Sequence, residues 1–231
     1  MVPNNALDAV VQRLDNAAGR AGRPSPRLLA VSKLQPAAAI AALLAAGQRA
    51  FGENYVQEAQ AKQAALSTDP RAERIEWHLI GHLQSNKAAL AATLFDWVQT
   101  VDRGKLVPLL AAARPDAQPS LNVLIQVNID DETRKHGCRP EDAAALADAI
   151  AAQPRLALRG LMAIPAPLPD LDRRRDAFRR MKVLFDALAT RHPGMDTLSM
   201  GMSEDFEIAI AEGATLVRVG TALFGARAAQ R

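Results

Sequence analysis

The sequence has 231 residues and only one cysteine, Cys138, so no disulfide bond and no paired-cysteine metal site can form within one chain. A lone cysteine is typical of proteins that fold in a reducing compartment. The N-terminus also lacks the cationic start and apolar core of a signal peptide. No apolar run approaches the ~20 residues that span a bilayer. We therefore expect a cytoplasmic protein with no membrane partner.

Aromatic residues and excess charge are scarce as well. Aromatic side chains make up 4% of the chain, and 28 basic against 25 acidic residues leave a net charge of +3. Nucleic-acid binding usually needs clustered lysine and arginine with aromatic residues between them. The densest basic segment, residues 173–180, is flanked and interrupted by Asp172 and Asp176, which is typical of a solvated helix face. We expect no nucleic-acid partner.

Hydrophobic residues make up 49% of the sequence, which is sufficient for a large core. Short apolar runs typical of strands alternate with segments of helical periodicity along the whole chain. The predicted strands are residues 28–32, 49–51, 76–80, 97–101, 121–129, 156–164, 197–200 and 216–219. The predicted helices are residues 4–22, 36–46, 55–66, 85–94, 103–113, 141–152, 171–191 and 204–211.

This alternation predicts an α/β fold, a single (β/α)8 TIM barrel with an extra N-terminal helix. Residues 1–26 form that helix and its lead-in, and we predict one domain over residues 1–231. An open, doubly wound sheet is the alternative. That fold usually carries a glycine fingerprint after its first strand, and residues 31–35 contain no glycine.

Lys33 ends the first predicted strand, directly after an apolar run. Burial beside apolar neighbours disfavours the charged ammonium and can make a lysine amine available for Schiff-base chemistry. The alternative is a strand-end lysine whose ammonium reaches water along its own methylene chain. The strand pattern alone leaves both interpretations open.

Polar residues on two predicted strands indicate a polar barrel interior. Asn122, Gln126 and Asn128 alternate with apolar residues on the fifth strand, so they share one face. Arg218 lies between two valines on the eighth strand, and its guanidinium cannot lie in the apolar layer beneath the helices. We predict that these side chains point into the barrel, with Arg218 near its C-terminal end.

Small residues follow the last two predicted strands, where barrels of this kind often bind phosphate. Ser203 follows the seventh strand, and Gly220 and Thr221 follow the eighth. Small residues let backbone N–H groups approach an anion, and a helix N-terminus adds a favourable field. The alternative is that Ser203 only caps the next helix, and both interpretations can hold together.

Four histidines are weaker candidates for a functional site. His78 and His82 share a face of the third strand, but no third metal ligand stands at a fitting spacing, so we predict structural roles for both. His136 and His192 fall in predicted loops and have no evident partner.

Four other residues are open to two interpretations. Glu53 and Asp102 end strands and are possible acids of the barrel rim, although capping of a helix explains Asp102. Cys138 lies close to basic residues in sequence, but we predict an ordinary loop thiol. Tyr55 is the only tyrosine and suits packing as well as chemistry.

Six ordered motifs carry a family resemblance. They are AVSK at residues 30–33, FGENY at 51–55, WHLIGHLQSNK at 77–87, RGLMAIP at 159–165, LSMGMS at 198–203 and VRVGTALFG at 217–225. With these motifs the chain resembles the YggS/PROSC family, the pyridoxal phosphate homeostasis proteins. One departure is His82, because the family usually has Gly-Pro where this chain has Gly81 and His82.

The resemblance implies a barrel like the N-terminal domain of alanine racemase, with pyridoxal 5'-phosphate (PLP) bound as an internal aldimine. It implies that Lys33 is the Schiff-base lysine, that Arg218 faces the pyridine nitrogen and that Asn54 lies near the ring. The phosphate ligands that it implies are Ser203, Gly220 and Thr221.

The resemblance further implies a role in PLP homeostasis, in which the protein binds, buffers or delivers PLP and thereby affects amino-acid metabolism. PLP-requiring apoenzymes are the implied partners. An arginine at the pyridine nitrogen cannot accept the ring proton and leaves PLP a weaker electron sink. Alanine racemase also uses a tyrosine base from an added domain, which we do not find in this sequence. We therefore expect no robust turnover.

Two alternatives stay open: a PLP-dependent amino-acid racemase of low activity, and a barrel that binds another phosphorylated metabolite without a covalent link. We expect a monomer, because the helix at residues 171–191 has no conspicuous second apolar face.

Overall fold

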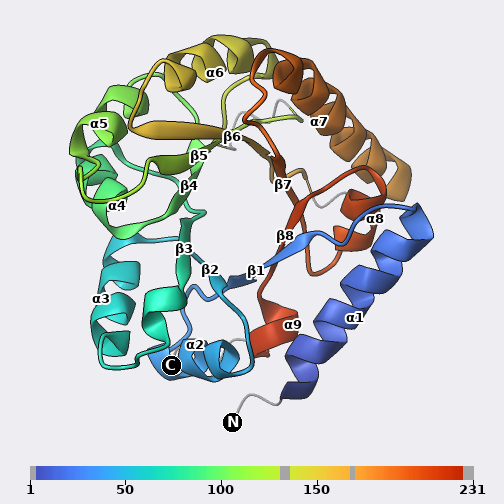
Figure 1. Ribbon diagram of the computed structural model, residues 1–231. Coiled ribbons are helices and arrows are strands. Elements are labelled where there is room, and N and C mark those ends of the chain that lie inside the picture. The colour runs from blue at the N-terminus through green and yellow to red at the C-terminus, as the bar shows by residue number, and fades with distance from the viewer. Residues whose placement is uncertain (1–3, 131–135, 167–169, 226–231) are drawn as a thin grey trace.

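The computed structural model describes residues 4–130, 136–166 and 170–225, and in them eight parallel strands close into a barrel (Figure 1). Neighbouring strands follow the order of the sequence, and the last strand pairs with the first. The strands are β1 (Arg27–Val31), β2 (Ala50–Glu53), β3 (Glu76–Leu79), β4 (Trp97–Val101), β5 (Leu121–Gln126), β6 (Leu156–Met162), β7 (Thr197–Met202) and β8 (Leu216–Val219). The predicted (β/α)8 barrel is confirmed.

Helices form a ring outside the strands (Figure 1). They are α1 (Asn4–Ala21), α2 (Ala37–Ala45), α3 (Val56–Leu66), α4 (Ala88–Leu94), α5 (Leu106–Ala113), α6 (Ala143–Ala151), α7 (Leu171–Arg191), α8 (Phe206–Ala211) and α9 (Thr221–Phe224). The extra N-terminal helix α1 packs on α8 and α9, and Arg13 lies over the ring of Phe206 at 4.5 Å.

The predicted boundaries differ most where the backbone leaves a regular ladder. The fifth strand was expected to reach residue 129, but β5 ends at Gln126. Beyond it the N–H group of Asn128 donates to the carbonyl of Cys138 at 2.8 Å, so the backbone bonds to a later loop. The helix expected at residues 204–211 begins at Phe206, so Ser203 is not at its N-cap position.

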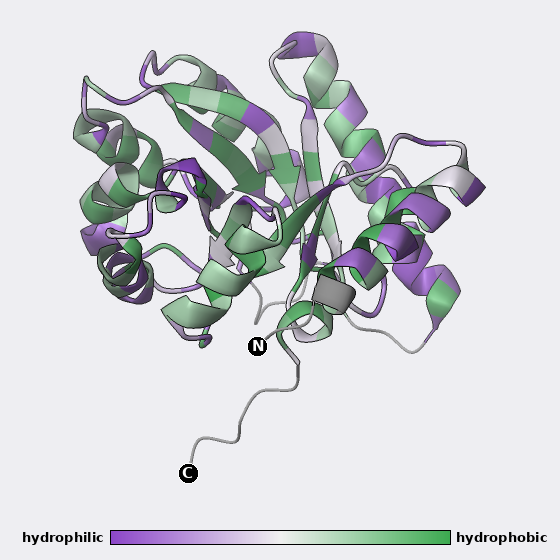
Figure 2. Cartoon of the chain, turned by 60° about the horizontal axis from the view of Figure 1, so that its bottom comes forward, coloured by the Kyte–Doolittle hydropathy of each residue, from purple (hydrophilic) through white to green (hydrophobic). Residues whose placement is uncertain are grey.

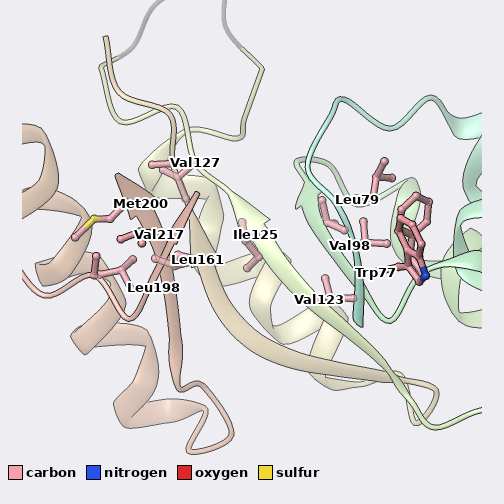
Figure 3. Packing of buried hydrophobic residues seen from close by; sticks show 14 of the residues in the cluster. Trp77, Leu79, Val98, Val123, Ile125, Val127, Leu161, Leu198, Met200 and Val217 are labelled. Carbon is pink, nitrogen blue, oxygen red and sulfur yellow. The ribbon is translucent and has the colours of Figure 1, made fainter. Parts of the chain in front are cut away.

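Two apolar layers line the two faces of the barrel wall. Residues of one parity, among them Val123 and Ile125 on β5 and Val127 just after it, join the main core between strands and helices (Figure 3). Residues of the other parity form small separate clusters, such as Leu29 with Ile80, inside the barrel. In Figure 2 the strands are mostly green, whereas the helices carry both hydrophobic and hydrophilic residues. Asn122 and Gln126 therefore have the inward parity that the sequence predicted.

Within the described residues, no helix is both long enough and apolar enough to cross a bilayer.

Gly160 on β6 occupies a position that no other residue can take without a shift of the backbone. Its φ is +149°, and a Cβ added there would lie 1.8 Å from the carbonyl oxygen of Thr197 on β7. The register between β5 and β6 also shifts beside it, between Val123 and Leu124. The close approach of β6 and β7 at this point therefore depends on glycine.

We expect Gly160→Ala to lower the free energy of unfolding by at least about 2 kcal/mol, because it combines a clash with backbone strain. Denaturation in guanidinium chloride measures the change. The matched control is Gly19→Ala in α1, where an added Cβ meets no atom within 4 Å. That control should raise stability by about 0.5–1 kcal/mol. Equal stability of Gly160→Ala and the unaltered protein would contradict the packing argument.

Candidate functional site

A cavity of about 320 Å³ opens at the C-terminal end of the barrel. Its volume lies within the usual range for small-molecule sites. Among the residues that line it are the six predicted from the sequence: Lys33, Asn54, Ser203, Arg218, Gly220 and Thr221. They come from the ends of β1, β2, β7 and β8, which the closed barrel brings to a single rim.

Lys33 lies two residues after the end of β1 and is half-buried in the cavity wall, which the apolar side chains of Val31 and Ile80 also line. Both of its chain neighbours are held by hydrogen bonds. The N–H of Ser32 donates to the carbonyl of Gly52 at 2.9 Å. Leu34 has a φ of +62°, and its N–H donates to Glu58 Oε1 at 2.5 Å. The backbone that carries Lys33 is therefore fixed on both sides.

The buried ammonium of Lys62 on α3 supports this segment from outside the barrel. It donates to the carbonyl of Ser32 at 2.7 Å, to Glu53 Oε1 at 2.8 Å and to Glu58 Oε1 at 2.7 Å. The hydroxyl of Ser32 donates to the same Glu53 oxygen at 2.6 Å. Burial raises the pKa of the Glu53 carboxyl, although the bonds from Lys62 and Ser32 oppose that shift. Glu53 is thus a buried ion-pair partner beneath the rim.

Arg218 on β8 is 4% exposed and points into the barrel, as the sequence predicted. Its guanidinium donates to Ser199 Oγ at 2.7 Å and to the carbonyl of Ala163 at 2.8 Å. Burial lowers the pKa of Arg218 to about 10, and the charge of Asp205 opposes the shift. The guanidinium therefore remains protonated at pH 7.

A chain of hydrogen bonds continues from Arg218 across the barrel interior. Ser199 Oγ donates to Gln99 Oε1 at 2.7 Å, and Gln99 Nε2 lies 2.8 Å from His78 Nδ1. His78 Nε2 lies 2.7 Å from Glu76 Oε1. The Gln99 amide nitrogen can only donate, so His78 Nδ1 accepts this hydrogen bond. His78 Nε2 therefore carries the ring proton and donates a hydrogen bond to Glu76. This assignment makes His78 neutral, which agrees with the lowering of its pKa by burial.

Ser203 lies in the cavity wall and does not cap α8. The N-cap position of α8 is Asp205, whose carboxylate accepts the N–H of Met202 at 2.7 Å. The interpretation of Ser203 as the N-cap is therefore wrong, because the helix begins two residues later than expected. Burial raises the pKa of Asp205, which also lines the cavity.

Gly220 lies where β8 turns into α9. A Cβ added there would lie 3.3 Å from the carbonyl oxygen of Val31 on β1. The turn therefore packs tightly on the strand that carries Lys33. Thr221 is exposed at the cavity and begins α9.

The sequence missed several residues of the cavity wall, including Gln35, Arg174 and Ile164. Arg174 lies on α7, in the arginine-rich segment that the sequence assigned to a solvated face. Only the packing of α7 beside β6 and β7 brings this residue to the rim. No local pattern in the sequence distinguishes Arg174 from its neighbours.

The sequence showed no partner for His136 or His192, and the structure gives each of them a neighbour. The His136 ring stacks on that of His82 with 3.8 Å between centroids. His192 Nε2 lies 3.1 Å from Asp148 Oδ1 but makes no hydrogen bond within the described residues. The prediction that Asp102 caps a helix is wrong, because its carboxylate binds Arg103 at 2.5 Å, while α5 begins only at Leu106.

Cys138 and Tyr55 take no part in the cavity wall. Cys138 is buried, and burial raises the pKa of its thiol to about 12, so it is not a reactive loop thiol. Tyr55 is 61% exposed.

The barrel and its rim cavity define a class of protein. Residues 6–228 match the family model described as "Alanine racemase, N-terminal domain". Within that class, the chain belongs to the family of pyridoxal phosphate homeostasis proteins. It is 52% identical over 224 residues to the pyridoxal phosphate homeostasis protein of Escherichia coli strain K12, covering 96% of this chain and 95% of that protein.

Solved structures agree with this assignment. PipY of Synechococcus elongatus PCC7942 with PLP bound has a TM-score of 0.83 and 38% identity, covering 96% of this chain and 99% of that chain. The same protein without PLP has a TM-score of 0.86 and 37% identity, covering 97% and 100%.

We expect Lys62→Met to lower the free energy of unfolding by about 3–5 kcal/mol, because it leaves the carboxylate of Glu53 buried without its cation. Glu53 Oε2 already has no hydrogen-bond partner among the described residues. Equilibrium unfolding measures the change. The control is Lys182→Met on α7, whose half-exposed ammonium binds Asp186, a pair that should contribute less than about 1 kcal/mol. Similar losses in the two variants would contradict the buried ion pair.

Proposed function

We propose that this protein binds PLP at the rim cavity and acts in PLP homeostasis by holding, buffering or delivering the cofactor. The observation that carries the proposal is that one cavity gathers an amine, a buried guanidinium and a cradle of small residues. PLP needs a partner for its aldehyde, its ring nitrogen and its phosphate, and these groups supply all three. The relatives named for PLP homeostasis and the PLP-bound PipY support it.

The residues of the cavity divide these tasks. Lys33 Nζ holds the cofactor covalently as a Schiff base, because its backbone is fixed and its side chain enters the cavity. Ser203, Gly220 and Thr221 surround the phosphate, where small residues leave backbone N–H groups accessible. Asn54, which also lines the cavity, is the residue that we propose near the ring.

Arg218 has the strongest influence on what the bound cofactor can do. PLP supplies an aldehyde that binds amines and a ring that can accept electrons when its nitrogen is protonated. Arg218 stays protonated and donates to Ser199 and Ala163, so it offers the ring nitrogen a donor and no acceptor. The ring is therefore a weak electron sink, and we propose binding without robust turnover.

A slow amino-acid racemase is the second candidate, and Asp205 is the observation that favours it. Its residue lines the same cavity, and burial raises the pKa of its carboxyl, which makes the carboxylate a stronger base. The described part of the cavity wall contains no tyrosine and no histidine.

PLP-requiring apoenzymes of the cytoplasm are the partners that we propose for the delivered cofactor.

We expect Lys33→Ala to abolish the Schiff-base absorbance and the capture of PLP by borohydride reduction. Mass spectrometry after proteolysis should place one phosphopyridoxyl group on Lys33 in the unaltered protein. The control is Lys105→Ala, whose side chain is exposed at the start of α5 and away from the cavity. An unchanged PLP spectrum in Lys33→Ala would contradict the proposal. If the unaltered protein bound phosphorylated ligands but showed no Schiff-base absorbance with PLP, a barrel that binds another phosphorylated metabolite would be favoured.

A turnover assay on the unaltered protein distinguishes a PLP carrier from a racemase. Alanine, serine and other L-amino acids are assayed for the D-product with and without added PLP. The carrier predicts turnover well below ~1 s⁻¹, which is the lower end of ordinary enzyme rates. Turnover at or above that rate, lost in Asp205→Asn, would establish the racemase instead.

We also propose a monomer. The apolar side chains exposed on α7 are isolated ones, Leu171 at 57% and Val183 at 64%. Scattered apolar residues of this kind do not make an interface. Light scattering should therefore give a mass near 24.8 kDa, and a mass near twice that value would contradict the proposal.

A further inference from the structure

A second cavity of about 400 Å³ has one lining residue, Asn54, in common with the rim cavity. Its wall includes His82 and His136, together with Tyr55 and Lys87. The two cavities share Asn54, but none of the other residues proposed to hold PLP lines the second one. The function of PLP binding therefore leaves this cavity unexplained.

Two imidazoles in the wall of this cavity lie beside a carboxylate, that of Asp102. His82 follows β3, Asp102 follows β4 and His136 follows β5, so three neighbouring strands contribute one residue each. His82 Nδ1 lies 3.4 Å from Asp102 Oδ2, and the two rings stack with 15° between their planes. One ligand atom from each residue can be chosen so that all lie within 4.8 Å of one another.

We propose that His82, Asp102 and His136 bind a divalent transition-metal ion of the zinc, cobalt and nickel class. Imidazole nitrogen together with a carboxylate oxygen is a ligand set that these ions favour. Three protein ligands leave one position of a tetrahedral ion open, and the adjoining cavity gives that position room for water or another small ligand.

The ligand atoms must approach one another for a single ion to be bound. Metal–ligand bonds of this kind place neighbouring ligand atoms of a tetrahedral site roughly 3.3 Å apart. Stacked rings cannot both direct an in-plane lone pair at one ion, so at least one ring must turn about its side-chain bonds. His82 has a side chain that is 31% exposed, and His136 is exposed, so both rings have space to turn.

Arg103 orients the carboxylate for this role. It donates to Asp102 Oδ1 at 2.5 Å and is itself held by the carbonyl of Leu83 at 2.9 Å. Asp102 Oδ2 is thereby left on the side of His82. A ligand fixed by a second shell of hydrogen bonds is typical of protein metal sites.

Cys138 is buried and is not among the residues whose ligand atoms lie together in this cluster. We therefore leave Cys138 out of the ligand set.

Titration calorimetry with zinc chloride tests the site on the full chain, both with and without PLP. One ion per chain is expected. Either His82→Ala or His136→Ala should weaken binding at least tenfold, since each removes one of three ligands. Asp102→Asn should weaken it as well. The matched control is His192→Ala, which removes a histidine paired with Asp148 outside the cluster and should leave the affinity unchanged.

Circular dichroism and PLP absorbance show whether each variant retains its fold and its cofactor site. His82→Gln and His136→Gln are second variants that keep a polar side chain of similar length. Unchanged zinc affinity in the histidine variants, or binding of zinc with no defined stoichiometry, would overturn the proposal. Its failure leaves the PLP spectrum, and hence the proposed function, unaffected.

Cobalt identifies the ligand atoms directly. Bound Co²⁺ should give visible bands of a nitrogen and oxygen site that disappear in His136→Ala. A strong near-ultraviolet charge-transfer band that disappears in Cys138→Ser would show a thiolate ligand and overturn the proposed set.

Discussion

The guanidinium of Arg218 imposes the strictest requirement on the barrel, because it is a permanent charge enclosed by the strand wall. A buried cation without partners costs several kcal/mol, so the wall must supply acceptors. Ser199 and the carbonyl of Ala163 do so, and Ser199 in turn needs Gln99 to accept its proton. The polar chain continues to His78, which it fixes as the neutral tautomer. One charge near the rim thus accounts for polar residues on four strands.

Lys62 imposes a similar requirement on the outer side of the wall. Its ammonium lies between α3 and the ends of β1 and β2, where Glu53 and the carbonyl of Ser32 satisfy it. Lys33 therefore lies between two backbone positions that charged side chains hold: the carbonyl of Ser32 accepts from Lys62, and the N–H of Leu34 donates to Glu58. Sites on such rigid supports keep their geometry without the ligand, which suits a protein proposed to hold a cofactor firmly.

The rim cavity and the second cavity differ in the kind of residues that form them. The cavity proposed for PLP depends on buried groups with fixed partners, such as Arg218 and Asp205. The cluster proposed for a metal ion depends on His82 and His136, whose rings are accessible and must turn to bind. A preformed site loses little entropy on binding, whereas an adaptable one pays for the order that it gains. We expect the first site to be selective and the second to bind more weakly.

The sequence by itself determined the barrel and six of the fifteen residues that line the rim cavity. Strand and helix periodicities are local, and the C-terminal ends of parallel strands must meet at one edge, so Lys33, Ser203 and Arg218 could be brought together from order alone. The exact start of α8 could not be predicted, because the N–H of Met202 donates to the Asp205 carboxylate in the turn before the helix, and Asp205 occupies the N-cap position.

Only the tertiary structure decided which distant residues become partners. The sequence assigned His82 a structural role and gave His136 no partner, yet β3, β4 and β5 place both beside Asp102. It also contained no sign that Lys62 pairs with Glu53 or that Arg174 reaches the rim. Periodicity specifies the face of an element on which a residue lies. Contacts across elements depend on the closure and twist of the barrel, which no local pattern records.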